Sequence, residues 1–244
     1  SPYADKPWFA SYPKGAPETI NPDKFRNLNA LWAQAVQDFG DTPAFTCMDK
    51  SISFKETDTL SNAFCAWLQH HSKLKPGDRV AIQMPNCLQY PVVMLGILKA
   101  GMVVVNVNPL YTAPEVEHQV KDSGAKAMVI IENFAASLQP IQNKLGLQHL
   151  IVTALGDLLG FKGHIVNFVV RNVKKMVPAY ELPGHLKLKD VLKQGKGKQA
   201  SIQDPDPNTN AYLQYTGGTT GVSKGAELTH RNIVSNVLQV ESWI

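Results

Sequence analysis

The sequence feature that most constrains the fold is an alternation of short apolar runs and longer amphipathic segments between residues 79 and 153. Residues 103–107 are almost continuously apolar, which is typical of a strand buried on both faces. The intervening segments are long enough for helical crossovers, so the order predicts an α/β fold with a mostly parallel sheet flanked by helices. The runs predict strands at 79–84, 103–107, 127–131 and 149–153, with helices at about 87–100, 113–124 and 134–145 between them.

Capping signals predict where several helices begin. Ser53 with Glu56, and Thr112 with Glu115, have the Ser/Thr-x-x-Glu spacing of capping boxes. Asn86 is expected to cap the helix that follows it. Upstream, the sequence predicts a helix over 28–39 and a hairpin of strands at 43–48 and 52–54.

The segment Y-T-G-G-T-T-G-V-S-K-G-A near the C-terminal end combines glycines, hydroxyl side chains and one lysine. Glycines tolerate positive φ, so successive backbone N–H groups here can converge on one anion. The hydroxyls add donors and the lysine adds a mobile positive charge, so a polyphosphate is the ligand that suits this loop. The candidate polyphosphate-binding segment consists of Tyr215, Thr216, Gly217, Gly218, Thr219, Thr220, Gly221, Val222, Ser223, Lys224, Gly225 and Ala226. Within it, residues 216–221, Lys224 and Gly225 are assigned to the phosphates themselves.

This segment is not a Walker A loop, because that motif ends in Gly-Lys-Ser/Thr and leads directly into a helix. Here residues 210–215 and 225–229 both predict strands, so the loop joins two strands and the next helix begins near His230. The alternative is a Gly/Thr-rich turn that binds nothing. A hairpin turn needs only about two to five residues, whereas this connection uses about nine.

The run T-G-G-T-T-G-V-S-K-G, followed by A-E-L-T-H-R-N, closely resembles the phosphate-loop signature of adenylate-forming enzymes. These enzymes include acyl-CoA synthetases, luciferases and the adenylation domains of peptide synthetases. Gly217 stands where serine is common and Ser223 where proline is common, but neither change removes a phosphate-facing group. Two further segments, I-S-F-K-E-T-D-T-L-S-N-A and L-K-A-G-M-V-V-V-N-V-N-P-L-Y-T, are similar to the family's first and second core motifs.

The resemblance implies ATP-dependent activation of a carboxylic acid through acyl-AMP to a CoA thioester, with AMP and pyrophosphate released. It implies ATP and Mg²⁺ as cofactors, CoA as co-substrate, and Thr216 as a residue near Mg²⁺. The family's adenine-binding, acidic, hinge and catalytic-lysine motifs lie beyond Ile244, so no catalytic residue is assigned here. Because Ser1 is not Met and the last helix is uncapped, we expect part of a longer enzyme, inactive in adenylation by itself.

Residues 156–200 contain nine Lys or Arg and only three Asp or Glu. Within them, 163–180 predicts an amphipathic helix with Asn167, Arg171, Lys174 and Lys175 opposite an apolar face. The helix is too short to span a bilayer, but apolar residues backed by cations suit a membrane interface. The apolar face is expected to contain Ile165, Val166, Phe168, Val169, Val170, Val173, Met176 and Val177.

Two interpretations of this helix stay open. In one, Arg171, Lys174 and Lys175 meet an anionic membrane surface; in the other, the helix docks on its own domain and its lysines are solvated. An insertion of this kind resembles bacterial long-chain fatty acyl-CoA synthetases, which associate peripherally with membranes. That resemblance implies a long-chain fatty acid as substrate and a cytoplasmic location, peripheral on the inner face of the cytoplasmic membrane.

The remaining signals limit other functions. The basic excess belongs to one segment, which argues against a nucleic-acid partner. Cys47, Cys65 and Cys87 lack metal-ligand or redox spacing and are expected to be reduced thiols. His230 is expected to have a structural role at the start of a helix. Residues 106–109 lie at the carboxyl end of a predicted strand, which is the edge where open α/β sheets bind ligands.

The sequence is expected to divide into four parts. These are an N-terminal arm (1–27), an α/β sheet layer (28–155), a basic amphipathic insertion (156–200), and the phosphate-loop hairpin with the start of the next helix (201–244). A homodimer is kept as a candidate assembly. Two alternative functions also stay open: an acyl-AMP ligase or short-chain or aryl-CoA synthetase, and a non-catalytic nucleotide- or membrane-binding module.

Overall fold

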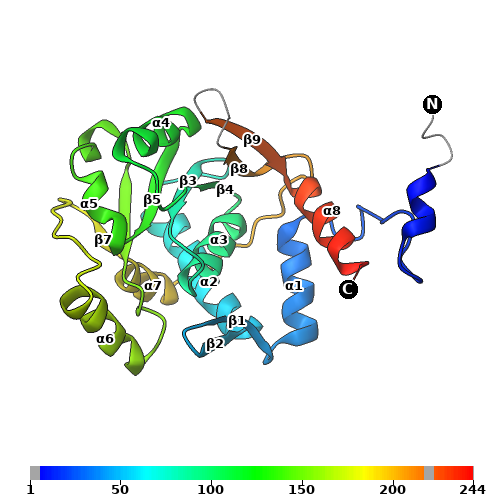
Figure 1. Cartoon of the computed structure of the whole chain (residues 1–244), viewed down its shortest axis with the longest axis horizontal. Helices are drawn as coiled ribbons and strands as arrows, with labels where there is room; N and C mark the ends of the chain where they lie inside the picture. The colour runs from blue at the N-terminus through cyan, green and yellow to red at the C-terminus, as the bar shows by residue number, and fades with distance from the viewer. Residues whose placement is uncertain (1–5, 217–222, 244) are drawn as a thin grey trace.

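The computed structural model describes residues 6–216 and 223–243, and its centre is a mostly parallel sheet (Figure 1). Strand order within this sheet is β7-β6-β5-β3-β4-β8-β9, and every neighbouring pair is parallel except β8 with β9. The predicted fold class is therefore confirmed. The strands are β3 Arg79–Gln83, β4 Val103–Asn106, β5 Ala125–Ile131, β6 His149–Thr153, β7 Leu186–Lys187, β8 Asn210–Thr216 and β9 Lys224–Thr229.

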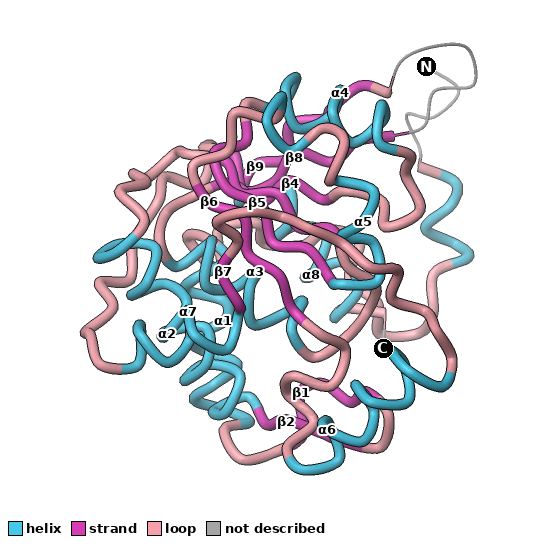
Figure 2. The backbone as a smooth tube through the Cα atoms, turned by 90° about the vertical axis from the view of Figure 1, so that its left-hand side faces the viewer, coloured by secondary structure: helices cyan, strands magenta, loops and turns pink. Residues whose placement is uncertain are grey.

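Helices cover both faces of the sheet (Figure 2). Alternate strand residues point to opposite faces, so Val80 and Ile82 join one core cluster while Ala81 joins the other. One face packs against α1 Leu28–Phe39, α2 Phe54–His71, α3 Gln89–Lys99 and α7 Leu188–Lys196; the other packs against α4 Ala113–Ser123 and α5 Ala135–Leu138. A separate antiparallel hairpin is formed by β1 Pro43–Cys47 and β2 Lys50–Ser53.

Both predicted capping boxes are present. At the start of α2, Glu56 N donates to Ser53 Oγ (3.1 Å) and Ser53 N donates to Glu56 Oε2 (2.9 Å). Thr112 and Glu115 form the equivalent box at the start of α4. The predicted cap at Asn86 is wrong, because α3 begins only at Gln89, after a bend in which Cys87 and Leu88 are buried.

The prediction of one helix over 134–145 is also wrong. The chain instead forms a 3₁₀ turn at η2 Glu132–Phe134, the short helix α5, and a second 3₁₀ turn at η3 Gln142–Lys144. Pro140 explains the interruption, because its ring has no N–H to donate and would clash with the carbonyl group four residues earlier in a continuous helix.

A buried lysine ties three helices together on one face of the sheet. Lys99 Nζ, at the end of α3, contacts Asp58 Oδ1 (2.6 Å) and Ser61 Oγ (2.6 Å) of α2. Trp32 Nε1 of α1 donates to the same Asp58 oxygen at 2.9 Å. Burial lowers the pKa of Lys99, and Asp58 acts in the opposite direction. The buried charge is thus held by a partner and by neutral acceptors, as burial of an ion requires.

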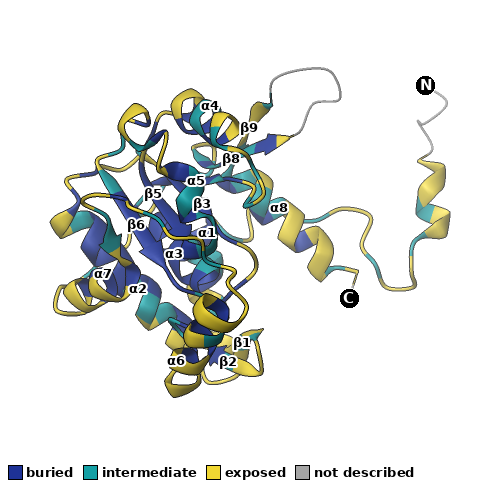
Figure 3. Cartoon of the chain, turned by 60° about the vertical axis from the view of Figure 1, so that its left-hand side comes forward, coloured by how far each residue is buried: buried dark blue, intermediate teal, exposed yellow. Residues whose placement is uncertain are grey.

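The basic segment differs from its predicted form. It contains α6 Phe161–Phe168 followed by a π-helical turn, η4 Val169–Val173, so the helix ends before residue 180. The predicted apolar face is divided, because Val166 and Val170 pack into the core while several of its other members are exposed (Figure 3). The exposed large apolar side chains of this segment are Phe161, Ile165, Phe168, Val173 and Met176, of which Phe161 is 84% exposed.

Its predicted polar face is not fully solvated either. Asn167 is buried, and its Oδ1 accepts a hydrogen bond from Gly156 N at 2.7 Å. Arg171 donates through Nε and Nη2 to the buried carboxylate of Glu132, which follows β5. The placement of Asn167 on a solvated face is therefore wrong. Arg171 is exposed but paired with Glu132, whereas Lys174 and Lys175 are exposed and form no ion pair with the described residues.

In the N-terminal arm, residues 6–12 stand away from the body beside the end of α8 (His230–Glu241), as Figure 1 shows, whereas Ile20 and Phe25 pack against the core. The described part includes the 3₁₀ turn η1 Pro7–Ser11, which buries no residue. Its aromatic rings pack on one another, and the Tyr12 ring lies 4.9 Å from the Trp243 ring between centroids.

Within residues 6–216 and 223–243, none of the helices has the length and apolar character needed to cross a membrane.

His230, the first residue of α8, is 2% exposed and links two distant parts of the chain. Its Nδ1 accepts a hydrogen bond from Leu28 N (3.4 Å), which joins the start of α8 to the start of α1. Burial lowers the pKa of His230 to about 4. The side chain is therefore neutral at physiological pH and has the structural role that the sequence predicts.

This burial predicts a pH dependence of stability. The pKa of His230 falls from 6.5 when unperturbed to about 4 in the folded state, so the unfolded chain binds the proton more readily. The contribution of uncharged His230 to the free energy of unfolding is fully present above pH 6.5 and is lost as the pH falls towards 4. A His230→Asn variant keeps a hydrogen-bond acceptor at this position but does not titrate. Between pH 6.5 and pH 4 we expect its free energy of unfolding to fall by about 2–3 kcal/mol less than that of the wild type. Urea denaturation at a series of pH values measures this difference, and identical pH profiles would contradict it.

Candidate nucleotide-binding site

The predicted phosphate loop connects the two antiparallel strands β8 and β9. Thr216 pairs with Lys224 at the ends of these strands, and Tyr215 pairs with Gly225. The prediction that the loop joins two strands, with a helix beginning near His230, is confirmed. Gly217, Gly218, Thr219, Thr220, Gly221 and Val222 lie outside the described residues.

Tyr215 anchors the base of this hairpin to α4. Its hydroxyl group donates to Asp122 Oδ2 at 2.6 Å, and burial followed by Asp122 raises the pKa of the phenol. Gly225 lies against the Tyr215 ring, where an added Cβ would come within 2.9 Å of the ring carbon Cζ. Because the ring is held by Asp122, glycine is the residue that fits opposite it. His118, also in α4, lies 3.3 Å from the Ser223 carbonyl oxygen through its Nε2.

At the mouth of the hairpin, the described side chains are accessible to a ligand. Thr216, Lys224, Gly225 and Ala226 are exposed, and Ser223 is half-buried. Among the described residues, Lys224 Nζ has no hydrogen-bond or ion-pair partner, so its positive charge is available. The Thr216 hydroxyl and the Lys224 ammonium group therefore belong to paired residues at the two strand ends.

A cavity of about 390 Å³ opens beside this hairpin at the carboxyl ends of β3, β4 and β8. It is lined by Met84, Asn86, Tyr90, Asn106, Asn108, Tyr111, Gln214 and Tyr215, among others. The segment 106–109 thus lies at the ligand-binding edge, as its position after a strand predicts.

A hydrogen-bonded chain of side chains crosses this cavity. Tyr90 OH donates to Asn106 Oδ1 (3.0 Å), and Asn106 Nδ2 donates to Gln214 Oε1 (3.0 Å). The link exists because β4 and β8 are adjacent, with Asn106 in register with Gln214. Tyr90, Gln214 and Asp122 are not predicted from the sequence, because their positions depend on a strand pairing and a helix contact that no local pattern encodes.

The structure does not gather the other sequence candidates at this site. His230 lies at the far end of β9, and Arg171 lies beside β5 and β6. The three cysteines are free; burial raises the pKa of Cys65 to about 12 and that of Cys87 to about 11, which makes both poor nucleophiles at neutral pH. In the part of the chain that the structure describes, no group of three or more His, Cys, Asp or Glu side chains could hold a metal ion.

The sequence of this chain matches a known enzyme family and several curated proteins. The model of the AMP-binding enzyme family matches residues 32–244. The long-chain-fatty-acid–CoA ligase of Escherichia coli O6:H1 (strain CFT073) is 49% identical over 97% of this chain, and that of Haemophilus influenzae is 46% identical over 98%. The chain spans 42% and 43% of the lengths of these two relatives.

A solved structure shares the fold. The crystal structure of a long-chain-fatty-acid–CoA ligase from Archaeoglobus fulgidus matches with a TM-score of 0.70 at 23% sequence identity. The match covers 95% of this chain and 42% of that structure.

Proposed function

Because the chain belongs to the AMP-binding enzyme family, we propose that it forms part of an enzyme that activates a long-chain fatty acid as its CoA thioester. In the first step, a carboxylate oxygen attacks the α-phosphorus of ATP, the bond from that phosphorus to the bridging oxygen breaks, and pyrophosphate leaves. In the second step, the CoA thiolate attacks the acyl carbon and AMP departs. The identities of 49% and 46% to long-chain-fatty-acid–CoA ligases support the choice of substrate class.

The observation that carries this proposal is the pairing of Thr216 with Lys224 across a hairpin whose connecting residues are rich in glycine and threonine. Negative charge develops on the departing pyrophosphate, and a positioned lysine with hydroxyl and amide donors stabilises it. We propose that residues 215–226 form the nucleotide-binding segment, in which residues 216–221, Lys224 and Gly225 bind the β- and γ-phosphates.

We also propose Mg²⁺ as a cofactor that supplies electrostatic stabilisation of the phosphates. Mg²⁺ prefers oxygen ligands and retains several waters, so it binds through substrate phosphates and one or two protein groups. The exposed Thr216 hydroxyl fits such a role as one oxygen ligand near the phosphates. CoA is the co-substrate of the second step.

The function is tested by pyrophosphate exchange with the full-length protein and carboxylates from acetate to oleate. We expect exchange to be fastest with long-chain acids and a thioester to appear when CoA is added. Exchange without thioester formation would favour an acyl-AMP ligase, and a preference for short or aromatic acids would contradict the fatty-acid proposal. Nucleotide binding without exchange for any acid would favour a non-catalytic module.

A second prediction concerns Lys224. In the full-length enzyme, Lys224→Ala should slow adenylation by about 10²–10³-fold, because one preorganised charge on the leaving group is removed. Thioester formation from supplied acyl-AMP should be spared, since pyrophosphate has already left. Lys193→Ala, at an exposed position on α7, is the matched control. Equal loss of both half-reactions in Lys224→Ala would contradict the assignment.

We further propose that the enzyme contacts anionic membrane peripherally through the surface of α6 and η4. Its exposed Phe161, Ile165 and Phe168 provide apolar contact, and Lys174 and Lys175 provide positive charge. Arg171 contributes less charge to this surface than the sequence suggests, because it is paired with Glu132. We also propose that the enzyme is located in the cytoplasm, at the inner face of the cytoplasmic membrane, and that it forms a homodimer. The proposed division of the chain into four parts has its boundaries after residues 27, 155 and 200.

Liposome co-sedimentation tests the membrane contact. Lys174→Glu/Lys175→Glu should weaken partitioning onto anionic vesicles by about tenfold or more, because each basic residue near the surface contributes about 1 kcal/mol. Phe161→Ser/Ile165→Ser should weaken it on neutral and anionic vesicles alike. Lys193→Glu/Lys196→Glu makes the same charge change on α7 and should have a smaller effect. Equal partitioning of all these variants and the wild type would rule out the surface.

A further inference from the structure

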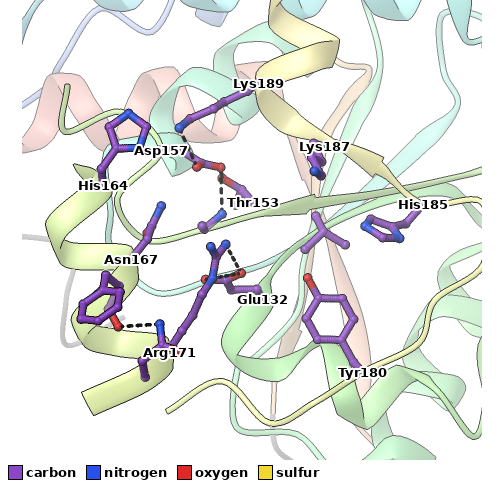
Figure 4. Close-up of a pocket in the computed structure, with 14 residues that line it drawn as sticks. Glu132, Thr153, Asp157, His164, Asn167, Arg171, Tyr180, His185, Lys187 and Lys189 are labelled. Carbon is purple, nitrogen blue, oxygen red and sulfur yellow. Dashed lines mark hydrogen bonds and ion pairs between the residues drawn. The ribbon is translucent and has the colours of Figure 1, made fainter. Parts of the chain in front are cut away.

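A second cavity, of about 380 Å³, lies at the carboxyl ends of β5, β6 and β7 beneath α6 and η4 (Figure 4). β6 is four strands away from β8 in the sheet order. With strands about 4.8 Å apart, the cavity is roughly 19 Å from the phosphate-loop hairpin across the sheet. It is therefore separate from the site described above, although it opens at the same ligand-binding edge.

The two carboxylates in this cavity are already satisfied. Glu132, which is 3% exposed, accepts from Arg171 Nη2 at 2.7 Å and from Nε at 3.0 Å. Asp157 pairs with Lys189 (3.2 Å) through Oδ1, while its Oδ2 accepts from Thr153 Oγ1 (2.9 Å) and Ala154 N (2.8 Å). A cation entering the cavity would find both carboxylates occupied.

Several donors in the cavity have no such partner. Within residues 6–216 and 223–243, neither Lys187 Nζ nor the Tyr180 hydroxyl group makes a hydrogen bond or ion pair, and Arg171 Nη1 has no acceptor. Lys187 is exposed, so its charge is solvated but has no carboxylate partner among the described residues. Strand pairing holds this residue in place, since Lys187 is in register with Val152 of β6.

Two histidines complete the lining. His185 Nδ1 lies 2.8 Å from the Leu182 carbonyl oxygen, which can only accept, so this nitrogen carries a proton and Nε2 is left for a ligand. His164 lies on α6 at the opposite side of the cavity, as Figure 4 shows. An unprotonated Nε2 can accept a hydrogen bond from a hydroxyl group of an acid ligand, and a protonated Nε2 can donate a hydrogen bond to an anionic oxygen.

We propose that this cavity is a second anion site, which binds a phosphate monoester through Lys187, Tyr180, Arg171 and His185. A tetrahedral dianion has acceptor oxygens for each of these donors and supplies the negative charge that Lys187 lacks. The phosphate can belong to a soluble metabolite or to a lipid headgroup, because Phe168 lines the cavity and is also exposed on the apolar surface of α6. The proposal does not depend on the function assigned to the phosphate loop.

The test measures inorganic phosphate binding by equilibrium dialysis at physiological ionic strength. The full-length protein carries Lys224→Ala in every sample, so that binding at the hairpin is suppressed. We expect Lys187→Glu to weaken phosphate binding by at least tenfold, and Tyr180→Phe, which keeps the ring in place, to weaken it about threefold or more. Lys193→Glu changes the net charge equally at an exposed position on α7 and should weaken binding less than twofold. Absence of measurable phosphate binding, or equal effects of Lys187→Glu and Lys193→Glu, would overturn the proposal.

The two sources are distinguished with vesicles of phosphatidylcholine containing either phosphatidic acid, a phosphate monoester, or phosphatidylglycerol, a diester. If Lys187→Glu weakens binding to phosphatidic acid vesicles selectively, the ligand is a lipid headgroup. If it weakens binding of inorganic phosphate and leaves both vesicle types unaffected, the ligand is soluble. An anomalous-scattering peak within the cavity of crystals soaked in tungstate, a tetrahedral dianion, would support the site. Tungstate found only elsewhere on the protein would count against it.

Discussion

The arrangement of the candidate site depends on the pairing of β8 with β4. This parallel ladder aligns Val104 with Tyr212, Val105 with Leu213 and Asn106 with Gln214, although more than 100 residues separate the two strands in the chain. It brings the phosphate-loop hairpin to the carboxyl edge of the sheet, where the segment after β4 already lies. The Tyr90–Asn106–Gln214 chain and the adjacent cavity exist only because of this register.

Buried charges are placed where they join elements together. Lys99 connects α3 to Asp58 of α2, and Asp58 also accepts from Trp32 of α1. Glu132, at the end of β5, holds Arg171 and with it the turn η4. In both cases removal of one partner would leave an ion without compensation, which costs more than the pair contributes.

Much of the fold could be predicted from local patterns, because the strands are strongly apolar and the capping boxes at Ser53 and Thr112 are local interactions. The strand–loop–strand arrangement around residues 217–222 was also predictable. The predictions that failed depended on contacts between distant residues. Asn167 is buried and accepts a hydrogen bond from Gly156 N, a contact that the helical periodicity of α6 does not encode. The cavity beneath α6 is formed by residues from 132 to 189 and has no motif of its own.

The long sequence separation between β4 and β8 also affects how the chain is synthesised. β4 leaves the ribosome about 110 residues before β8 is complete, which at about 5–20 residues per second is on the order of 5–20 s. During that time one edge of a strand rich in valine has no partner, and unpaired apolar edges favour association with other chains. We therefore expect the nascent protein to depend on chaperones most strongly between the synthesis of β6 and that of β8, when β3, β4, β5 and β6 can already pair but the edge beside β4 is still open.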